Sequence, residues 1–480
     1  MWDLVLIMLS ELGCKFQQHP HRTLLSLAFP VMGSLVAEPI AALTDTVFVE
    51  RLGAVSASGL GAATMVLFGT TWVFNFLNVG TQTEVARAAG SGDRALAAAW
   101  ARLSLQLAVW LGLLLTGVLW LGMGPVLSFM SDRADIQQEA AAYLSIRALG
   151  APAMLVTFAA CGALRGLSLM RLPLWITALS AGLNVLLDPL LIFGPGPLPA
   201  YGIRGAAAAT VVGQVIAAVT AIALLRRALP FALARKAATQ PRARQLMHIG
   251  GDMMLRTGAL LLFMLLATRA ALQEGPATGA AHQGVRQVWM FLAFLLDAFA
   301  ASAQSLVAYF LGSGQRQQAR NVATLVCRWG IGTGLVLLAL MLPAGEFARS
   351  LLVPPEAYDD FDRIWWICAL AQPINALSFV TDGLHWGASE YRYLRNAMLT
   401  SSALGIGGLL LLPTGQSMTL ALIWWTSMAF LASRAALGVL RVFPGFGPVW
   451  GAVRPTNPPV HKAPTHQSPR IRSEQEVATR

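Results

Sequence analysis

The sequence predicts an all-α membrane protein with twelve transmembrane helices in two pseudo-symmetric six-helix lobes. Composition is the first observation behind this prediction. Of the 480 residues, 56% are hydrophobic and only 12% are charged, whereas about 25% of a soluble domain is charged. The mean hydropathy is +0.60. Twelve apolar stretches and an internal repeat are the other two observations, and together the three exclude a soluble fold.

Each apolar stretch is long enough to cross a bilayer, because a transmembrane helix needs about 20 mainly apolar residues. Residues 1–22 come before the first stretch and are too short and too interrupted to span, so we expect an interfacial segment there. The expected spans are 24–49, 56–80, 95–121, 141–165, 173–194, 203–226, 247–273, 280–306, 322–345, 363–387, 395–413 and 417–441.

The distribution of charged residues predicts the orientation of these spans. Residues 226–244 contain six Lys and Arg and no acid, whereas Asp132, Asp135, Asp359 and Asp360 fall in loops on the opposite side. Because basic loops stay in the cytoplasm, we expect a multi-pass inner-membrane protein with both termini cytoplasmic. The net charge of +11 is concentrated in a few loops and predicts no nucleic-acid partner.

The predicted organisation has five parts. An N-terminal lobe (23–226) holds spans one to six, and a C-terminal lobe (247–445) holds spans seven to twelve. A basic cytoplasmic linker, 227–246, joins the two lobes. The remaining parts are the interfacial segment 1–22 and the polar, proline-containing tail 446–480, which we expect to be disordered.

An internal repeat relates the two lobes. Residues 81–97 and 303–319 are identical at eight of seventeen positions when offset by 222 residues. A second match, at an offset of 221, pairs Pro152 with Pro373 and surrounds Gly162 and Gly383. Six spans per copy place both copies in the same orientation, a geometry typical of transporters that rock two bundles about a central cavity. A duplication that serves only as scaffold is the alternative.

Two carboxylates lie inside apolar stretches of the first copy only. The repeat partners of Asp45 and Asp188 are Ala267 and Leu409. An acid at the centre of a transmembrane helix costs about 2.5–3.5 kcal/mol, so acids confined to one copy are candidates for loading a proton or a small cation. Asn184 lies one helical turn before Asp188. The alternatives are a hydrogen-bonded acid near the outer interface for Asp45 and a helix-kink motif for Asp188.

Two further residues of the first lobe belong to this hypothesis. The Thr210 hydroxyl could complete a hydrogen-bonded set with Asn184 and Asp188, although packing explains a single threonine nearly as well. Pro30 lies fifteen residues before Asp45 in the same span. A proline there can bend the helix and permit a two-state change, and a static kink is equally compatible with the pattern.

The second lobe has a different polar set, in spans seven, eight and ten. Asp252 and Arg256 are one turn apart on one helix, and Asp297 and Asp382 are expected toward the same membrane face. We interpret these four residues as a charge-compensated network that locks the bundle, with gating or coupling as the second possibility. The sequence shows no nucleotide loop, catalytic triad or metal-ligand cluster, so we expect neither an enzyme, nor a metal site, nor a cofactor other than a coupling ion.

Several stretches, in the correct order, make the chain resemble the multidrug and toxin extrusion family, within its DNA-damage-inducible-protein-F (DinF-like) branch. The resemblance spans about residues 20–445. It rests on LTDTVFVERLG, LNVLLDPLLIFG and GIRGAAAAT in the first half and on GDMMLRTGALL, LLDAFAASAQ and TDGLHWGASEYRYLRNAM in the second.

This resemblance implies a twelve-helix, two-lobe antiporter. The family's first-span acid falls on Asp45, its fifth-span amide and acid on Asn184 and Asp188, its sixth-span threonine on Thr210, and its bending proline on Pro30. The sodium-coupled branch keeps an acid early in its tenth span, where this sequence has Asn375. That departure favours proton coupling.

The expected function is a secondary active antiporter that exports lipophilic or cationic drugs or metabolites in exchange for H⁺ or Na⁺ by alternating access. Its expected partners are a small organic substrate and the lipid bilayer, and we expect a monomer. A lipid-linked saccharide flippase of the same superfamily is the alternative. It would need a cationic central cavity, and the first lobe offers few basic residues near mid-membrane.

Overall fold

A computed structural model describes residues 12–194, 199–412, 419–443 and 449–451. The predicted interfacial segment is therefore described only from residue 12, and nearly all of the predicted tail lies outside the described residues. Residues 12–18 are helical and lead into the first long helix after a one-residue break. The described residues form helices joined by short connections and contain no strand.

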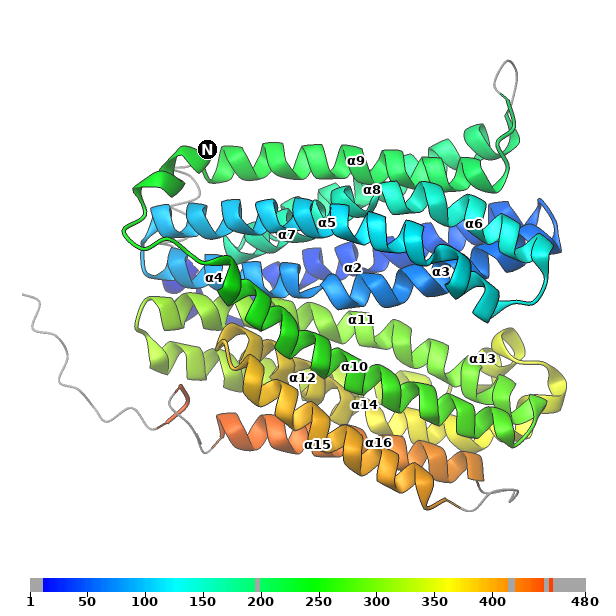
Figure 1. Ribbon diagram of the computed structural model, residues 1–480. Coiled ribbons are helices and arrows are strands. Elements are labelled where there is room, and N and C mark those ends of the chain that lie inside the picture. The colour runs from blue at the N-terminus through cyan, green and yellow to red at the C-terminus, as the bar shows by residue number, and fades with distance from the viewer. Residues whose placement is uncertain (1–11, 195–198, 413–418, 444–448, 452–480) are drawn as a thin grey trace, which may run out of the picture.

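The helices fall into two sets, which Figure 1 shows as an upper and a lower half of the molecule. The first set is α2 (Pro20–Glu50), α3 (Ala54–Phe74), α4 (Phe76–Gly90), α5 (Arg94–Met130), α6 (Ala134–Leu149), α7 (Ala151–Gly166), α8 (Arg171–Phe193) and α9 (Ile203–Ala228). The second set is α10 (Ala243–Gln273), α11 (Pro276–Gly312), α12 (Arg316–Met341), α13 (Gly345–Leu352), α14 (Tyr358–Gly387), α15 (Tyr391–Leu410) and α16 (Thr419–Val442).

The helices confirm the predicted fold class. In the described residues, ten helices are long and apolar enough to cross a membrane, with α3 and α4 taken as one, and the bent pair α6 and α7 adds an eleventh. The twenty-residue α15 packs against α10 and α16 and occupies the eleventh predicted span. Short 3₁₀ turns, Phe231–Lys236 and Pro355–Ala357, lie in the connections before α10 and α14.

Two predicted spans are interrupted rather than continuous. The second is broken at Asn75, between α3 and α4, and the fourth bends by 48° between α6 and α7. Pro152 follows the second break directly and has no backbone N–H to give to the preceding turn, which explains a bend at that place. By contrast, α2 continues as one helix through Pro30 and Pro39.

The two halves touch through reciprocal close contacts between α4 and α11. A Cβ at Gly90 would lie 2.0 Å from the backbone oxygen of Tyr309, and a Cβ at Gly312 would lie 2.0 Å from the backbone oxygen of Arg87. Gly90 and Gly312 are repeat partners. Only glycine permits an approach this close, so the repeated Gly-Ser-Gly motif marks where the halves meet.

Hydrogen bonds across the same interface repeat this symmetry. The Gln82 amide donates to the Ser305 hydroxyl at 2.9 Å, and the Gln304 amide donates to the Thr83 hydroxyl at 2.8 Å. Each amide also donates to a backbone oxygen of the opposite half, at 2.7 and 2.8 Å. All four side chains are buried. The halves are therefore joined by a dry, satisfied polar seal.

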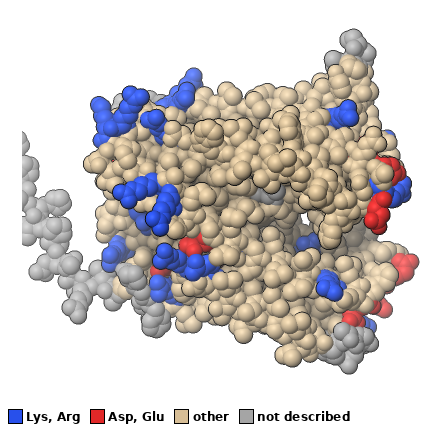
Figure 2. Space-filling view, viewed as in Figure 1, with Lys and Arg blue, Asp and Glu red and all other residues tan. Residues whose placement is uncertain are grey.

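This seal lies toward the basic end of the molecule. Figure 2 shows Lys and Arg gathered at the left-hand end, where the α4–α5 and α11–α12 turns lie, and most of the visible acids at the right-hand end. Toward the right-hand end, Figure 2 also shows an opening between the upper and lower halves. The molecule is thus closed at its basic end and parted toward its acidic end.

Candidate ion-coupling site and buried charge networks

The four polar residues singled out in the first lobe lie together. The Thr210 hydroxyl of α9 donates to an Asp45 carboxyl oxygen of α2 at 3.4 Å. The Asn184 amide of α8 donates to the Thr210 hydroxyl at 3.2 Å and to Asp188 at 3.4 Å. Three helices therefore contribute to one continuous set of hydrogen bonds, which contains both carboxyl groups.

This set is buried and incompletely satisfied. Asp45, Asn184 and Asp188 are 7%, 3% and 0% exposed, respectively. The second carboxyl oxygen of each aspartate, Oδ1 of Asp45 and Oδ2 of Asp188, has no hydrogen-bond partner in the described structure, and neither does Oδ1 of Asn184. Buried oxygens without donors are costly. A proton or a small cation bound here would supply the missing partner.

The two carboxyl groups also interact with each other. Asp45 and Asp188 lie close enough for a hydrogen bond between their side chains, and such a bond requires a proton on one of them, because an ionised carboxylate can only accept. Two like charges at this separation disfavour double ionisation. A single proton shared between the two carboxyl groups would relieve this repulsion.

Three residues that the sequence reasoning missed extend the site on its other side. The Tyr143 hydroxyl of α6 lies within hydrogen-bonding reach of Arg147 and Thr210 and interacts electrostatically with Asp45. Arg147 donates to the Gln214 side chain of α9 at 2.9 Å. Tyr143 therefore connects the Arg147 guanidinium to the Thr210 hydroxyl that contacts Asp45. A charge inside the apolar segment YLSIRALG was the signal available in the sequence.

Pro30 stands apart from this cluster on α2. It lies inside the helix and is partly buried, fifteen residues before Asp45. Pro39, six residues before Asp45, is the second proline of the same helix. The predicted hinge role of Pro30 stays a prediction.

The second lobe holds a buried ion network around Asp382. Its Oδ2 atom accepts from both Arg256 of α10 and Arg434 of α16, the latter at 2.8 Å. The Arg256 guanidinium also lies over the Trp386 ring, and that of Arg434 lies over Phe430, at 5.3 and 5.6 Å from the ring centres. Two cations share one anion, which leaves the triad with a net charge of +1.

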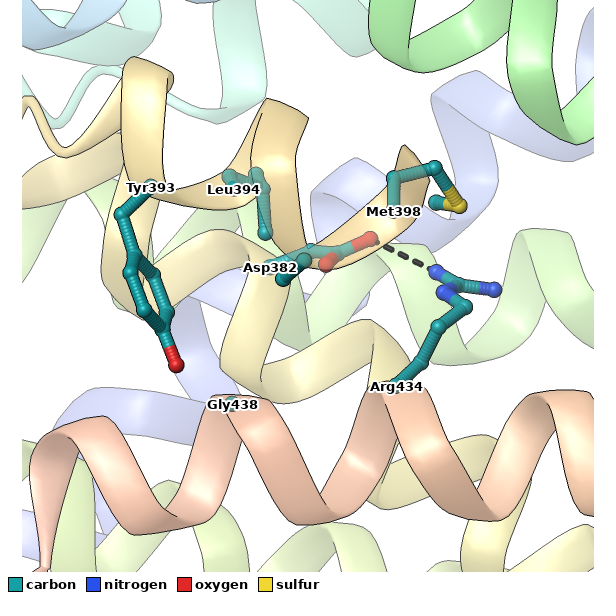
Figure 3. A pocket seen from close by; sticks show the side chains of 7 residues that line it. Asp382, Tyr393, Leu394, Met398, Arg434 and Gly438 are labelled. Carbon is teal, nitrogen blue, oxygen red and sulfur yellow. Dashed lines mark hydrogen bonds and ion pairs between the residues drawn. The ribbon is translucent and has the colours of Figure 1, made fainter. Parts of the chain in front are cut away.

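Figure 3 shows how this network is seated. Asp382 and Arg434 point toward each other beside a cavity of about 10 Å³, room for about one water molecule. Tyr393 and Met398 of α15 line the same cavity. Arg434 was missed by the sequence reasoning, although it interrupts the apolar segment MAFLASRAALG. A cavity this small has no room for an organic substrate in this conformation.

The other two predicted members of the network are placed differently. Asp252 accepts from Arg395 of α15 at 2.5 Å, and its role in the network stays a prediction. The packing of α10 against α15 brings this arginine within reach. Asp297 of α11 is partly buried and interacts electrostatically with Asp382 and Arg256.

A set of hydrogen bonds centred on Glu390, here called the Glu390 clamp, joins helix ends at the basic end of the second lobe. Glu390, between α14 and α15, accepts from Arg441 at 2.9 and 3.1 Å and from the Trp450 indole at 2.9 Å, and it contacts His385 Nδ1 at 2.9 Å. Burial alone would raise the pKa of the Glu390 carboxyl, but the hydrogen bond and charge of His385 and the charge of Arg441 together lower it below its ordinary value. The clamp ties the ends of α14, α15 and α16 to residue 450.

Asn375, where the sequence departs from the sodium-coupled branch, is fully buried in α14. Its amide nitrogen and oxygen have no hydrogen-bond partner in the described structure. In the described residues, no group of three or more His, Cys, Asp and Glu side chains is placed to hold a metal ion. A cation in either lobe would therefore depend on amide, hydroxyl or carbonyl oxygens as well as on carboxylates.

Comparison with known families decides the identity of the chain. The MatE family model matches residues 30–190 and 250–408, so most of both lobes is covered. The chain belongs to the MatE family. The first match contains Asp45 and Asp188, and the second contains Asp252 and Asp382.

MatE relatives agree along nearly the whole chain. Protein DETOXIFICATION 44, chloroplastic, of Arabidopsis thaliana is 33% identical over 89% of this chain and 84% of its own length. DNA damage-inducible protein F of Escherichia coli is 25% identical over 86% of this chain and 90% of its own. The predicted family is confirmed, and the predicted branch is among the relatives. Members of this family are transporters, not enzymes.

Solved MatE structures share the fold. The crystal structure of MATE in the bent conformation superimposes with a TM-score of 0.78 at 19% identity, and the match covers 87% of this chain and 93% of that one. Together with the helix lengths, this likeness confirms a multi-pass membrane protein with the two-lobe, twelve-helix architecture.

Proposed function

We propose that this MatE transporter is an antiporter that exports a small organic substrate in exchange for a proton carried by Asp45 and Asp188. The observation that carries the proposal is the buried carboxyl pair, in which one oxygen of each aspartate has no hydrogen-bond partner in the described structure. Buried carboxyl groups that interact bind a proton more readily than exposed ones. Such a pair gives a transporter a charge that can be neutralised and restored.

Alternating access follows from the placement of this pair relative to the seal. The halves are joined at the basic end by Gln82 and Gln304, and Figure 2 shows them parted toward the other end. If the basic end faces the cytoplasm, as the positive-inside rule predicts, this conformation faces outward. Protonation removes charge among α2, α8 and α9, which repacks the first lobe and expels substrate. The proton is released after the seal opens on the other side.

Proton coupling is the first choice for the ion, and Na⁺ is the second. Asp45, Asn184, Asp188 and Thr210 present carboxylate, amide and hydroxyl oxygens to one place, and hard cations prefer such ligands. A proton needs only one carboxylate oxygen, whereas a hard metal cation needs several oxygen ligands at once. In the second lobe, Asn375 brings no charge to a sodium site.

The proposed substrate is lipophilic or cationic, and the proposed location is a bacterial-type inner membrane with both termini cytoplasmic. The names of the DETOXIFICATION relatives fit the export of harmful compounds. The saccharide flippase alternative would need guanidinium groups directed at a pyrophosphate. The buried Arg256 and Arg434 are directed at Asp382 instead, so this alternative is not favoured.

Transport in proteoliposomes with an imposed pH or Na⁺ gradient, measured with a panel of organic cations, tests the proposal. An inward proton gradient should drive substrate out of vesicles that contain the native protein. Asp45→Asn and Asp188→Asn should each abolish gradient-driven transport while folded protein remains in the membrane. Asp132→Asn, at an exposed acid in the turn between α5 and α6, is the matched control and should transport normally. A proton-driven rate in both carboxyl variants equal to that of the native protein would overturn the proposal.

A further inference from the structure

A polar hollow lies between the start of the first lobe and α12 of the second. Its volume is about 550 Å³, and it lies between residues 16–21 and the N-terminal half of α12. It is separate from the aspartate pair and from the Asp382 network, whose residues do not line it. The hollow spans the junction of the two halves, and the proposed transport mechanism makes no use of it.

One face of α12 supplies most of the polar lining. Gln318, Asn321, Thr324 and Arg328 follow one another at intervals of three, three and four residues, which places them along one face of the helix. The Asn321 amide donates to the Gln318 carbonyl at 3.2 Å, which leaves the amide end of Gln318 to donate elsewhere. The Thr324 hydroxyl donates to the Arg320 backbone oxygen at 3.1 Å, so Gln318 and Arg328 are the main donors toward the hollow.

Arg328 is the charged member of this row. It lies six residues inside the predicted span 322–345, and its side chain is exposed. Within the described part of the chain, no carboxylate pairs with it. An arginine this far inside an apolar span is costly unless an anion or the interface compensates it. The hollow beside it is where such an anion would sit.

His21 adds a second donor from the other lobe. The Trp329 indole donates to His21 Nδ1 at 3.0 Å. A ring nitrogen that accepts carries no proton, so the proton of the neutral ring is on Nε2, which is then a donor. The Trp329 ring stacks on Phe299, with centroids 6.3 Å apart, and this contact holds the indole in place.

Below Arg328 the same face of α12 becomes apolar and stays exposed. Ile331 and Leu335 follow at helical spacing and are 41% and 51% exposed. The hollow is therefore continuous with a surface that fits acyl chains. A charged polar pocket above an exposed apolar track matches a phospholipid better than a free anion.

We propose that this hollow binds the phosphate headgroup of an anionic phospholipid from the leaflet at the basic end, with Arg328 as the principal contact. The lipid bridges residues 16–21 of one lobe and α12 of the other at the closed end of the molecule. Because it contacts both lobes there, it stabilises this conformation over one in which the closed end opens. The assignment does not depend on which substrate or ion is transported.

The test measures lipid binding to the purified full-length protein by native mass spectrometry and by the thermal unfolding temperature. The probes are dioleoyl phosphatidylglycerol, dioleoyl phosphatidylcholine and inorganic phosphate. Phosphatidylglycerol should bind about tenfold more tightly than phosphatidylcholine, as expected for one charge-assisted contact. It should also raise the unfolding temperature, whereas inorganic phosphate should not.

Two variants at one position and a control decide the assignment. Arg328→Ala and Arg328→Gln should both lose the preference for phosphatidylglycerol, and the glutamine retains a polar side chain should alanine impair folding. Arg392→Ala, at an exposed arginine in the first turn of α15, should keep the preference. An unchanged preference in both Arg328 variants would overturn the proposal. An equal rise in unfolding temperature with inorganic phosphate would also overturn it, because the ligand would then be a soluble anion.

Discussion

At the scale of single residues, the two lobes treat buried charge in opposite ways. Asp45 and Asp188 keep oxygens without donors, whereas Asp382 is held by two guanidinium groups. The aspartate pair can gain or lose a proton at little structural cost, because no ion pair is broken. The Asp382 network resists rearrangement, because removing the anion or either cation leaves a buried charge uncompensated.

Replacing Asp382 of α14 should therefore destabilise the protein more than replacing Asp252 of α10, which is also paired with an arginine. Asp382→Asn leaves Arg256 and Arg434 buried without their anion, and removal of one partner from a buried pair costs about 3–5 kcal/mol. Asp252→Asn breaks the more exposed pair with Arg395 and should cost about 1 kcal/mol or less. Thermal unfolding of both variants in detergent checks this order, and equal losses would contradict the locking role of Asp382.

The Glu390 clamp should make stability depend on pH in the acid range. Because the pKa of Glu390 is lower in the folded protein than its ordinary value of 4.5, the clamp contributes full stability above that value. The contribution is lost as the pH falls through the lowered folded pKa. Glu390→Gln should reduce the unfolding temperature at neutral pH, and the difference from the native protein should shrink below pH 4.5. A constant difference down to the acid limit would refute this.

Single-residue reasoning identified the aspartate pair because a carboxylate inside an apolar span stands out in any sequence. It could not connect Tyr143, Arg147 or Gln214 to the pair, since that depends on the rotation of α6 and α9 about their axes. It also did not find Arg395, the partner of Asp252. Two charged residues one turn apart on a helix can meet different neighbours, as Asp252 and Arg256 do, and sequence spacing does not show which.

At the scale of elements, the spans could be predicted and their interruptions could not. The helices α5 and α11 extend past their predicted ends at 121 and 306, through further residues that are mainly apolar. The break at Asn75 has no proline or glycine beside it to announce it. The bend after Gly150 has Pro152, which was noted only as a repeat partner.

The close contact between α4 and α11 should not tolerate a side chain at Gly90. Gly90→Ala would place a methyl group 2.0 Å from a backbone oxygen, and backbone cannot yield as a side chain does, so the helices must separate at a cost of about 1–3 kcal/mol. A cysteine at Ser305 in a cysteine-free background should then react faster with maleimide. Gly251→Ala is the control, because a Cβ there meets nothing within 4 Å. Unchanged labelling with Gly90→Ala would show that the contact is not tight.

At the scale of the whole molecule, the internal repeat is visible as symmetry in the seal. Gln82 and Gln304 make equivalent bonds in opposite directions. The repeat predicted two similar lobes in one orientation. It could not predict which end would be closed, since both alternating states of a transporter satisfy the same sequence.

Because Gln82 and Gln304 have equivalent roles in the seal, replacing either one should weaken the seal equally. Gln82→Leu and Gln304→Leu each remove two donated hydrogen bonds, worth about 0.5–1.5 kcal/mol apiece, and each should open the basic end to the same extent. Spin labels at Arg94 and Arg316, which are exposed repeat partners, report the separation of the halves by pulsed electron resonance. The two variants should shift the distance distribution alike, and a shift in only one would show that the seal is functionally asymmetric.

The paired glycine contacts also limit how the molecule can move. Gly90 against Tyr309 and Gly312 against Arg87 are two separate points at which main chain touches main chain. Two fixed points define a rotation axis. Turning about the line through them leaves both distances unchanged, whereas sliding one half past the other drives a carbonyl into a neighbouring backbone. The easiest deformation is therefore a rigid-body rotation of one half about this line, and the displacement it produces grows with distance toward the acidic end.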